Sequence, residues 1–134
     1  MREANSEVAL VVQIEHRDGI DSIDEILEVE GVDGAFIGPL DLSGSYGKPG
    51  DLICAEMTDA LSRFRRSCEA HGKAAGMHIV QPEPDNIEAA MESGYTMVAL
   101  GLDNVFLASG ARFAIQHARA AVFAARVGRF RLVC

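Results

Sequence analysis

Apolar residues follow two alternating patterns along the chain. Short runs rich in valine, leucine, isoleucine and alanine are typical of strands buried in a parallel sheet. Stretches with apolar residues at helical spacing separate these runs. We expect strands at residues 8–15, 34–37, 73–80 and 95–100. A helix should follow each strand: one capped by Asp18, one over about 53–71, one capped by Asp85 and one over about 103–125.

The order of these elements is a strand–helix unit repeated four times. Strands that alternate with helices predict a parallel sheet with right-handed crossovers, and therefore an α/β fold. Four such units make half of an eight-stranded (β/α)₈ barrel, but they could also form a small open doubly wound sheet. No shift in composition divides residues 1–134, so we expect one domain. Residues 43–50, rich in glycine, predict a loop, and residues 126–134 an irregular tail.

Composition narrows the classes of function. The 134 residues carry a formal net charge of -8, which argues against a nucleic-acid partner. We also expect no membrane segment and no signal peptide, because no apolar run approaches the length of a bilayer span and the first residues are polar. The three cysteines form no Cys-x-x-Cys motif. A reduced, cytoplasmic compartment is therefore the expectation.

Polar side chains mark the ends of the first two predicted strands. Gln13 and Glu15 are two positions apart and should share one side of the first strand, while Asp41 follows the second strand. About one βαβ unit separates the two carboxylates, which should bring them to one rim of the sheet. Two carboxylates with open positions suit a hard divalent cation such as Mg²⁺ or Mn²⁺. Alternatively, they cap the helix and loop that follow them.

Five segments together resemble one known family, the HpcH/HpaI aldolases. Class II aldolases of this family use a metal ion to cleave 2-keto-3-deoxy acids such as 4-hydroxy-2-oxoheptanedioate and 2-dehydro-3-deoxyglucarate. The resemblance covers roughly residues 8 to 125. The matching segments are Val12–Glu15, Gly31–Ser43, Gly47–Gly50, Lys73–Gly76 and Ala99–Asp103.

The resemblance implies a role for each site residue. Glu15 and Asp41 would be the two metal ligands, and Gln13 would lie beside bound pyruvate or its enolate. The backbone at Leu40 and Asp41 would hold the pyruvate carboxylate. The substrate would be a small keto acid of the pyruvate or oxaloacetate type. The family fold is a (β/α)₈ barrel, so this chain would supply strands five to eight of a usually hexameric enzyme.

The resemblance also implies what this chain would lack. The catalytic histidine and the substrate-binding arginine of the family lie in its N-terminal half, so no residue here takes those roles. We expect a partial aldolase that forms a homo-oligomer or pairs with a separate N-terminal half. Two alternatives stay open: a non-catalytic half-barrel assembly module, and a lyase resembling citrate lyase or malyl-coenzyme-A lyase. Among the histidines, His16 is expected in an exposed loop, and His78 in a structural role.

Overall fold

The computed structural model describes residues 7–129. Contacts divide the chain into two units, Met1–Leu100 and Gly101–Cys134. The first unit contains a four-stranded parallel sheet in the order β1-β2-β3-β4, which confirms the predicted α/β class and leaves β1 and β4 at its edges. The strands are β1 Val11–Ile14, β2 Gly34–Ile37, β3 Ala74–Ile79 and β4 Met97–Leu100.

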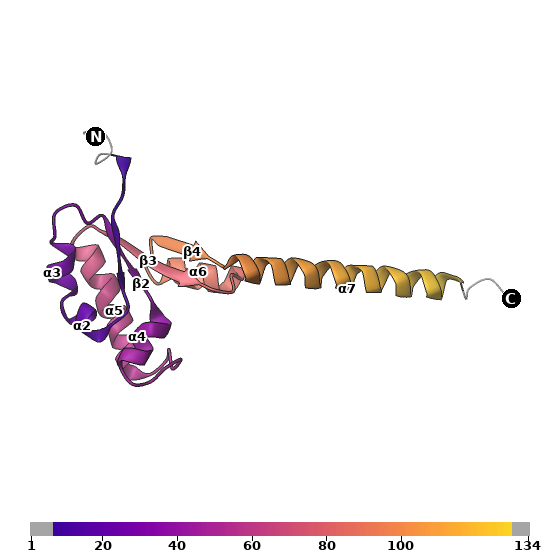
Figure 1. Cartoon of the computed structure of the whole chain (residues 1–134), viewed down its shortest axis with the longest axis horizontal. Coiled ribbons are helices and arrows are strands. Elements are labelled where there is room, and N and C mark those ends of the chain that lie inside the picture. Colours follow the sequence, from indigo (N-terminus) through magenta and orange to yellow (C-terminus); the bar gives the residue numbers. More distant parts are fainter. Residues whose placement is uncertain (1–6, 130–134) are drawn as a thin grey trace. The chain divides into compact units, whose positions relative to one another are not determined.

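Helices follow the strands as the apolar pattern predicts. The helices are α2 Arg17–Asp21, α3 Ile23–Leu27, α4 Pro39–Ser45, α5 Ala55–Ala70, α6 Pro84–Glu92 and α7 Asp103–Arg129. Helix α5 packs on β2 and β3, and α2 and α3 pack on α5 (Figure 1). All three helices therefore belong to the layer that covers one face of the sheet.

The covered face of the sheet forms the hydrophobic core. Ile14 and Ile37 pair across β1 and β2 and are almost completely buried, as is Ala75 on β3. Helix α5 buries one stripe of apolar side chains, at the helical spacing that the sequence shows. The buried members of that stripe are Met57, Ala60, Phe64 and Cys68.

The opposite face of the sheet carries a different set of side chains. Gln13, Phe36, Gly76 and Met97 pair in one row across the four strands. A Cβ atom on Gly76 would lie 2.5 Å from Cδ2 of Phe36 and would also collide with Met97. Glycine at this position therefore leaves room for both neighbouring side chains above the middle of the sheet. We call this surface the open face.

The N-terminal region departs from the prediction in two ways. Strand β1 starts only at Val11, and Leu10 before it is 52% exposed, so the strand is not buried on both faces. The single helix expected after Asp18 is two short helices that meet at Ser22. The cap of α2 is His16, whose Nδ1 accepts a hydrogen bond from the Asp18 backbone N–H at 3.2 Å.

The predicted loop at 43–50 is partly helical. Helix α4 continues to Ser45, with proline at its first position. The buried Ser43 hydroxyl donates to the Leu40 carbonyl at 2.6 Å and accepts from the Gly50 backbone N–H at 2.8 Å. Composition predicted a loop because glycine and serine favour turns, but these bonds and the burial of Leu42 stabilise a helical turn.

The ends of two later helices also differ from the prediction. Helix α6 is capped two residues earlier than predicted, by Glu83 instead of Asp85, and the Glu83 N–H donates to Asn86 Oδ1 at 3.0 Å. Helix α7 continues to Arg129. The irregular tail predicted for 126–134 is therefore wrong for 126–129, and the remainder lies outside the described residues. A single domain over residues 1–134 stays a prediction.

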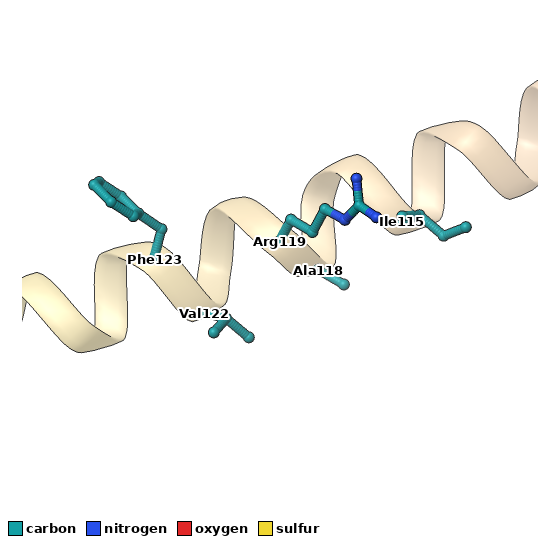
Figure 2. Close-up of a pocket in the computed structure, with 5 residues that line it drawn as sticks. All are labelled: Ile115, Ala118, Arg119, Val122 and Phe123. Atoms are coloured by element: carbon teal, nitrogen blue, oxygen red, sulfur yellow. The ribbon is translucent and has the colours of Figure 1, made fainter.

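The second unit is the long helix α7. Several of its large apolar side chains are exposed, among them Phe106 at 53%, Leu107 at 76%, Phe113 at 63% and Val122 at 55%. Further along, a shallow hollow of about 410 Å³ is formed by side chains from this one helix (Figure 2). Across residues 7–129, no helix is both long and apolar enough to cross a bilayer.

Candidate active site at the carboxyl ends of the strands

A cavity of about 450 Å³ opens at the carboxyl ends of β1, β2 and β3. In parallel α/β folds this is the end of the sheet where ligands bind. Every residue that the sequence marked for metal or substrate binding lies around it. The lining residues are Gln13, Glu15, Phe36, Ile37, Gly38, Pro39, Leu40, Asp41, Leu52, His78 and Val80.

Glu15 is held in place by its two nearest neighbours. Its Oε1 accepts a hydrogen bond from Gln13 Nε2 at 2.5 Å. On its other side, a Cβ atom added to Gly38 would lie 2.7 Å from Glu15 Cγ and 2.8 Å from Oε1. The φ angle of Gly38 is -103°, which any residue can adopt. Glycine is therefore needed at this position because a side chain would take the space of the Glu15 carboxylate. The alternative that Glu15 caps the next helix is wrong, because His16 is that cap.

Asp41 reaches the cavity from the first turn of α4. The first hydrogen bond of that turn runs from the Leu42 N–H to the Gly38 carbonyl, at 3.0 Å. Backbone N–H groups before it, at Leu40 and Asp41, belong to the positions of a helix that have no carbonyl partner one turn back. Carboxylate charge in a first turn is also favoured by the helix dipole. The sequence predicted Asp41 beyond β2 but not on a helix.

The donor set of the cavity fits a hard divalent cation. Glu15 and Asp41 offer carboxylate oxygens, and Gln13 adds an amide. Among residues 7–129 there is no cluster of three or more His, Cys, Asp and Glu side chains suited to a metal ion. Mg²⁺ is commonly held by one or two carboxylates together with water and substrate oxygens, so a pair of carboxylates matches its chemistry.

Seven of the eleven lining residues were not assigned to the site from the sequence, and three of them, His78, Phe36 and Leu52, show why. His78 was expected in a structural role, yet it lines the cavity from β3. Phe36 lies on the open face beside Gln13. Alternation along a strand places Gly76 and His78 on one side, but the sequence alone does not give the register that aligns them with Gln13.

Leu52 is the third of these residues, and it lies on the loop between α4 and α5, just after the segment Gly47–Gly50. Two contacts fix that loop. Lys48 Nζ lies 2.8 Å and 2.7 Å from the two carboxylate oxygens of Glu56, and Gly50 is bound to Ser43. The hydrogen bond between Lys48 and Glu56 raises the pKa of the lysine and lowers the pKa of the glutamate. These contacts hold the loop that brings Leu52 to the cavity wall.

The fold and the site together define an α/β-barrel type of protein with an acidic cavity at its strand ends. The chain belongs to the HpcH/HpaI aldolase/citrate lyase family, whose model matches residues 1–110. The resemblance seen in the sequence is therefore confirmed. Enzymes of this family are aldolases and lyases, as the names of its relatives state.

Two curated relatives and one solved structure illustrate the match. The chain is 41% identical to the 2-keto-3-deoxy-L-rhamnonate aldolase of Klebsiella pneumoniae, over 78% of this chain and 39% of the relative. It is 43% identical to the hydroxypyruvate/pyruvate aldolase of Roseovarius nubinhibens, over 81% of this chain and 42% of the relative. The chain thus spans about two fifths of the length of these relatives.

The solved structure is an HpcH/HpaI aldolase/citrate lyase family protein from Burkholderia cenocepacia. Its TM-score with this chain is 0.80 at 30% sequence identity, and the match covers 88% of this chain and 45% of that one. The four strand–helix units of this chain therefore have the fold of part of an HpcH/HpaI aldolase.

Proposed function

We propose that this chain carries the metal- and keto-acid-binding part of a class II aldolase that cleaves 2-keto-3-deoxy acids to pyruvate and an aldehyde. The observation that carries the proposal is the meeting of Gln13, Glu15 and Asp41 in one cavity at the carboxyl ends of the strands. The two curated relatives are both aldolases, which supports this class of reaction.

Glu15 and Asp41 would hold a divalent cation, Mg²⁺ or Mn²⁺. When bound, the cation would act as a Lewis acid on the ketone and carboxylate oxygens of the keto acid. Gly38 leaves space for the Glu15 carboxylate, and the Gln13 amide holds one of its oxygens. Gly38 and Gln13 would hold the Glu15 carboxylate in position before the cation binds, which lowers the entropy cost of binding.

The remaining residues would bind and orient the keto acid. The amide of Gln13 would lie beside the oxygen on which negative charge develops. Backbone N–H groups at Leu40 and Asp41 would receive the carboxylate. In the cleavage, a base takes the proton of the substrate hydroxyl, the carbon–carbon bond next to it breaks, and its electron pair forms the enolate of pyruvate. Protonation of that enolate carbon completes pyruvate. No residue of this chain is assigned as the base.

Calorimetry with Mn²⁺ and Mg²⁺ tests the metal site directly. The chain should bind one cation, and Glu15→Ala and Asp41→Ala should each abolish binding. Asp85→Ala is the matched control, because Asp85 is an exposed carboxylate that does not line the cavity. Binding that survives both site substitutions, or that is lost in the control, would contradict the proposal.

Turnover provides a second test. We expect retro-aldol activity of the isolated chain to be near background, because positioned acid–base groups contribute about 10²–10⁴-fold and none is assigned here. Slow, metal-dependent decarboxylation of oxaloacetate should survive and should disappear in Glu15→Ala. Pyruvate release is followed with lactate dehydrogenase and NADH. Aldol cleavage at the rate of an intact aldolase would show that another residue supplies the base.

The edges of the sheet favour a second candidate function, a half-barrel that assembles with another chain. Strands β1 and β4 each have one unpaired edge within the described residues. Apolar side chains on them are exposed, Val11 at 37% and Leu100 at 48%. Unpaired, apolar strand edges favour association. An assembled chain that binds no divalent cation would favour this function over the aldolase.

A further inference from the structure

A second cavity lies at the other end of the sheet. It has a volume of about 520 Å³, within the range of sites for small molecules, and it shares no lining residue with the acidic cavity. Its walls come from α5, from Lys73 just before β3, and from the turn between α6 and β4 that includes Gly94 and Thr96. These segments precede the strands, so the cavity belongs to their amino ends.

The charge of this cavity is opposite to that of the chain. Arg65, Arg66 and Lys73 line it, together with one acidic residue, Glu69. The chain as a whole has a net charge of -8. Within residues 7–129, no ion pair joins Glu69 to any of the three cations. Three positive side chains around one hollow in an acidic protein create a local field that favours an anion.

Two of the cations are held in position by neutral partners. Arg65 Nη1 donates to the Tyr95 hydroxyl at 3.3 Å, and its guanidinium carbon lies 5.3 Å from the centre of the Tyr95 ring. Lys73 Nζ donates to the Val32 carbonyl at 2.6 Å. An ammonium group has three N–H donors and a guanidinium has five, so both keep donors for a ligand. Neither positive charge is neutralised by its partner.

Two further side chains keep hydrogen-bond donors that no acceptor in the described part of the chain uses. The exposed side chain of Arg66 forms no hydrogen bond or ion pair there. The Thr96 hydroxyl accepts from the Ala75 backbone N–H at 3.0 Å, which leaves its own hydrogen for another acceptor. Guanidinium groups match phosphate oxygens in pairs, and hydroxyl groups complete such sites.

We propose that this cavity binds the phosphate group of a small phosphorylated molecule, at a site separate from the metal and keto-acid site. Arg65, Arg66 and Lys73 supply the positive charge and Thr96 supplies a hydroxyl donor. The volume leaves room for an organic group beside the phosphate. No acidic residue other than Glu69 lines the cavity, so divalent cations are not needed for this binding.

Calorimetry in the presence of EDTA tests the site on the purified 134-residue chain. The probes are glycerol 3-phosphate and inorganic phosphate, with glycerol as the uncharged control, all at one ionic strength. We expect both phosphates to bind and glycerol to give no heat. Arg66→Gln should weaken glycerol 3-phosphate binding about tenfold, the factor for one lost charge-assisted hydrogen bond. Arg66→Glu should abolish it.

The matched control is Arg63→Gln, which removes the same charge from the same helix. Arg63 pairs with Asp21 and does not line the cavity, so this variant should keep the affinity of the unaltered chain. Far-UV circular dichroism checks that each variant is folded. The proposal is overturned if neither phosphate binds, or if Arg66→Gln and Arg63→Gln weaken binding equally.

Amide chemical shifts in ¹H–¹⁵N spectra give an independent readout of position. Glycerol 3-phosphate should shift the signals of Gly94 and Thr96 and leave those of Glu15 and Asp41 unchanged. Shifts confined to the acidic cavity would overturn the proposal even if calorimetry detected binding.

Discussion

The two faces of the sheet differ in what they contribute to the protein. Ile14 is 3% exposed on the face covered by helices, whereas its neighbour Gln13 points to the open face and lines the acidic cavity. One strand thus carries a core residue and a site residue side by side. Alternation along a strand therefore places the residue that stabilises the fold and the residue that lines the site at adjacent positions on opposite faces of the sheet.

The largest expected difference between the two faces is in stability. Ile14→Ala should lower the free energy of unfolding by about 2–5 kcal/mol, because it leaves a cavity in the core. Gln13→Ala should change that free energy by no more than about 0.5 kcal/mol, since the side chain is exposed. Urea denaturation followed by circular dichroism measures both. Equal losses would show that the open face is also part of the core.

The next-largest effect is expected at Glu15, the carboxylate that lines the acidic cavity at the end of β1. Gly38→Ala should weaken Mn²⁺ binding about tenfold or more, because the new methyl group would lie only 2.7 Å from Glu15 Cγ and 2.8 Å from Oε1 and would displace the carboxylate. Gly44→Ala is the control, since a Cβ atom there meets nothing within 4 Å. Calorimetry compares the two. Unchanged affinity in Gly38→Ala would mean that Glu15 can bind the cation from another position.

The unpaired edges of strands β1 and β4 also predict that copies of the chain associate with one another. Light scattering at micromolar concentration should detect particles larger than one 14.4 kDa chain. Val11→Lys, which places a charge on the exposed edge strand β1, should reduce the associated fraction several-fold. Glu88→Lys, an exposed change on α6 with the same new side chain, should not. A compact monomer in the unaltered chain would contradict this expectation.

The smallest expected effect is on the pH dependence of stability, and it concerns Asp24, an exposed residue of α3. A hydrogen bond from Ser67, joined by His71 at 3.3 Å, lowers the pKa of Asp24 below its ordinary value of 3.8. The folded state therefore binds this proton more weakly than the unfolded state. The stability that this contact contributes is present above about pH 3.8 and is lost as the pH falls through the folded pKa.

Asp24→Asn isolates that contribution. Urea denaturation at a series of pH values should show a slightly weaker loss of stability in acid for this variant. Asp59→Asn, at an exposed position of α5, should leave the acid dependence as it is. An unchanged pH profile in Asp24→Asn would show that the contact with Ser67 and His71 adds nothing to stability.

The order of the strands and helices, and the polar residues at the strand ends, were predictable from the amino-acid pattern alone. Continuous apolar runs and helical spacing gave four strands and the stripe of α5, because burial selects apolar residues at fixed periods. Spacing along β1 and past β2 also predicted that Gln13, Glu15 and Asp41 would approach one another. The segments that resemble the HpcH/HpaI family named the same three residues.

Features that depend on contacts between distant residues became visible only in the folded chain. Residues 43–45 of the predicted loop form the end of α4, with a bond between Ser43 and Gly50, and His16 caps α2 in place of Asp18. His78 joined the site through the strand register, which no local pattern encodes. The basic cavity arose in the same way, since Arg66 and Thr96 lie thirty positions apart and are brought together by the packing of α5 on β3 and the pairing of β3 with β4.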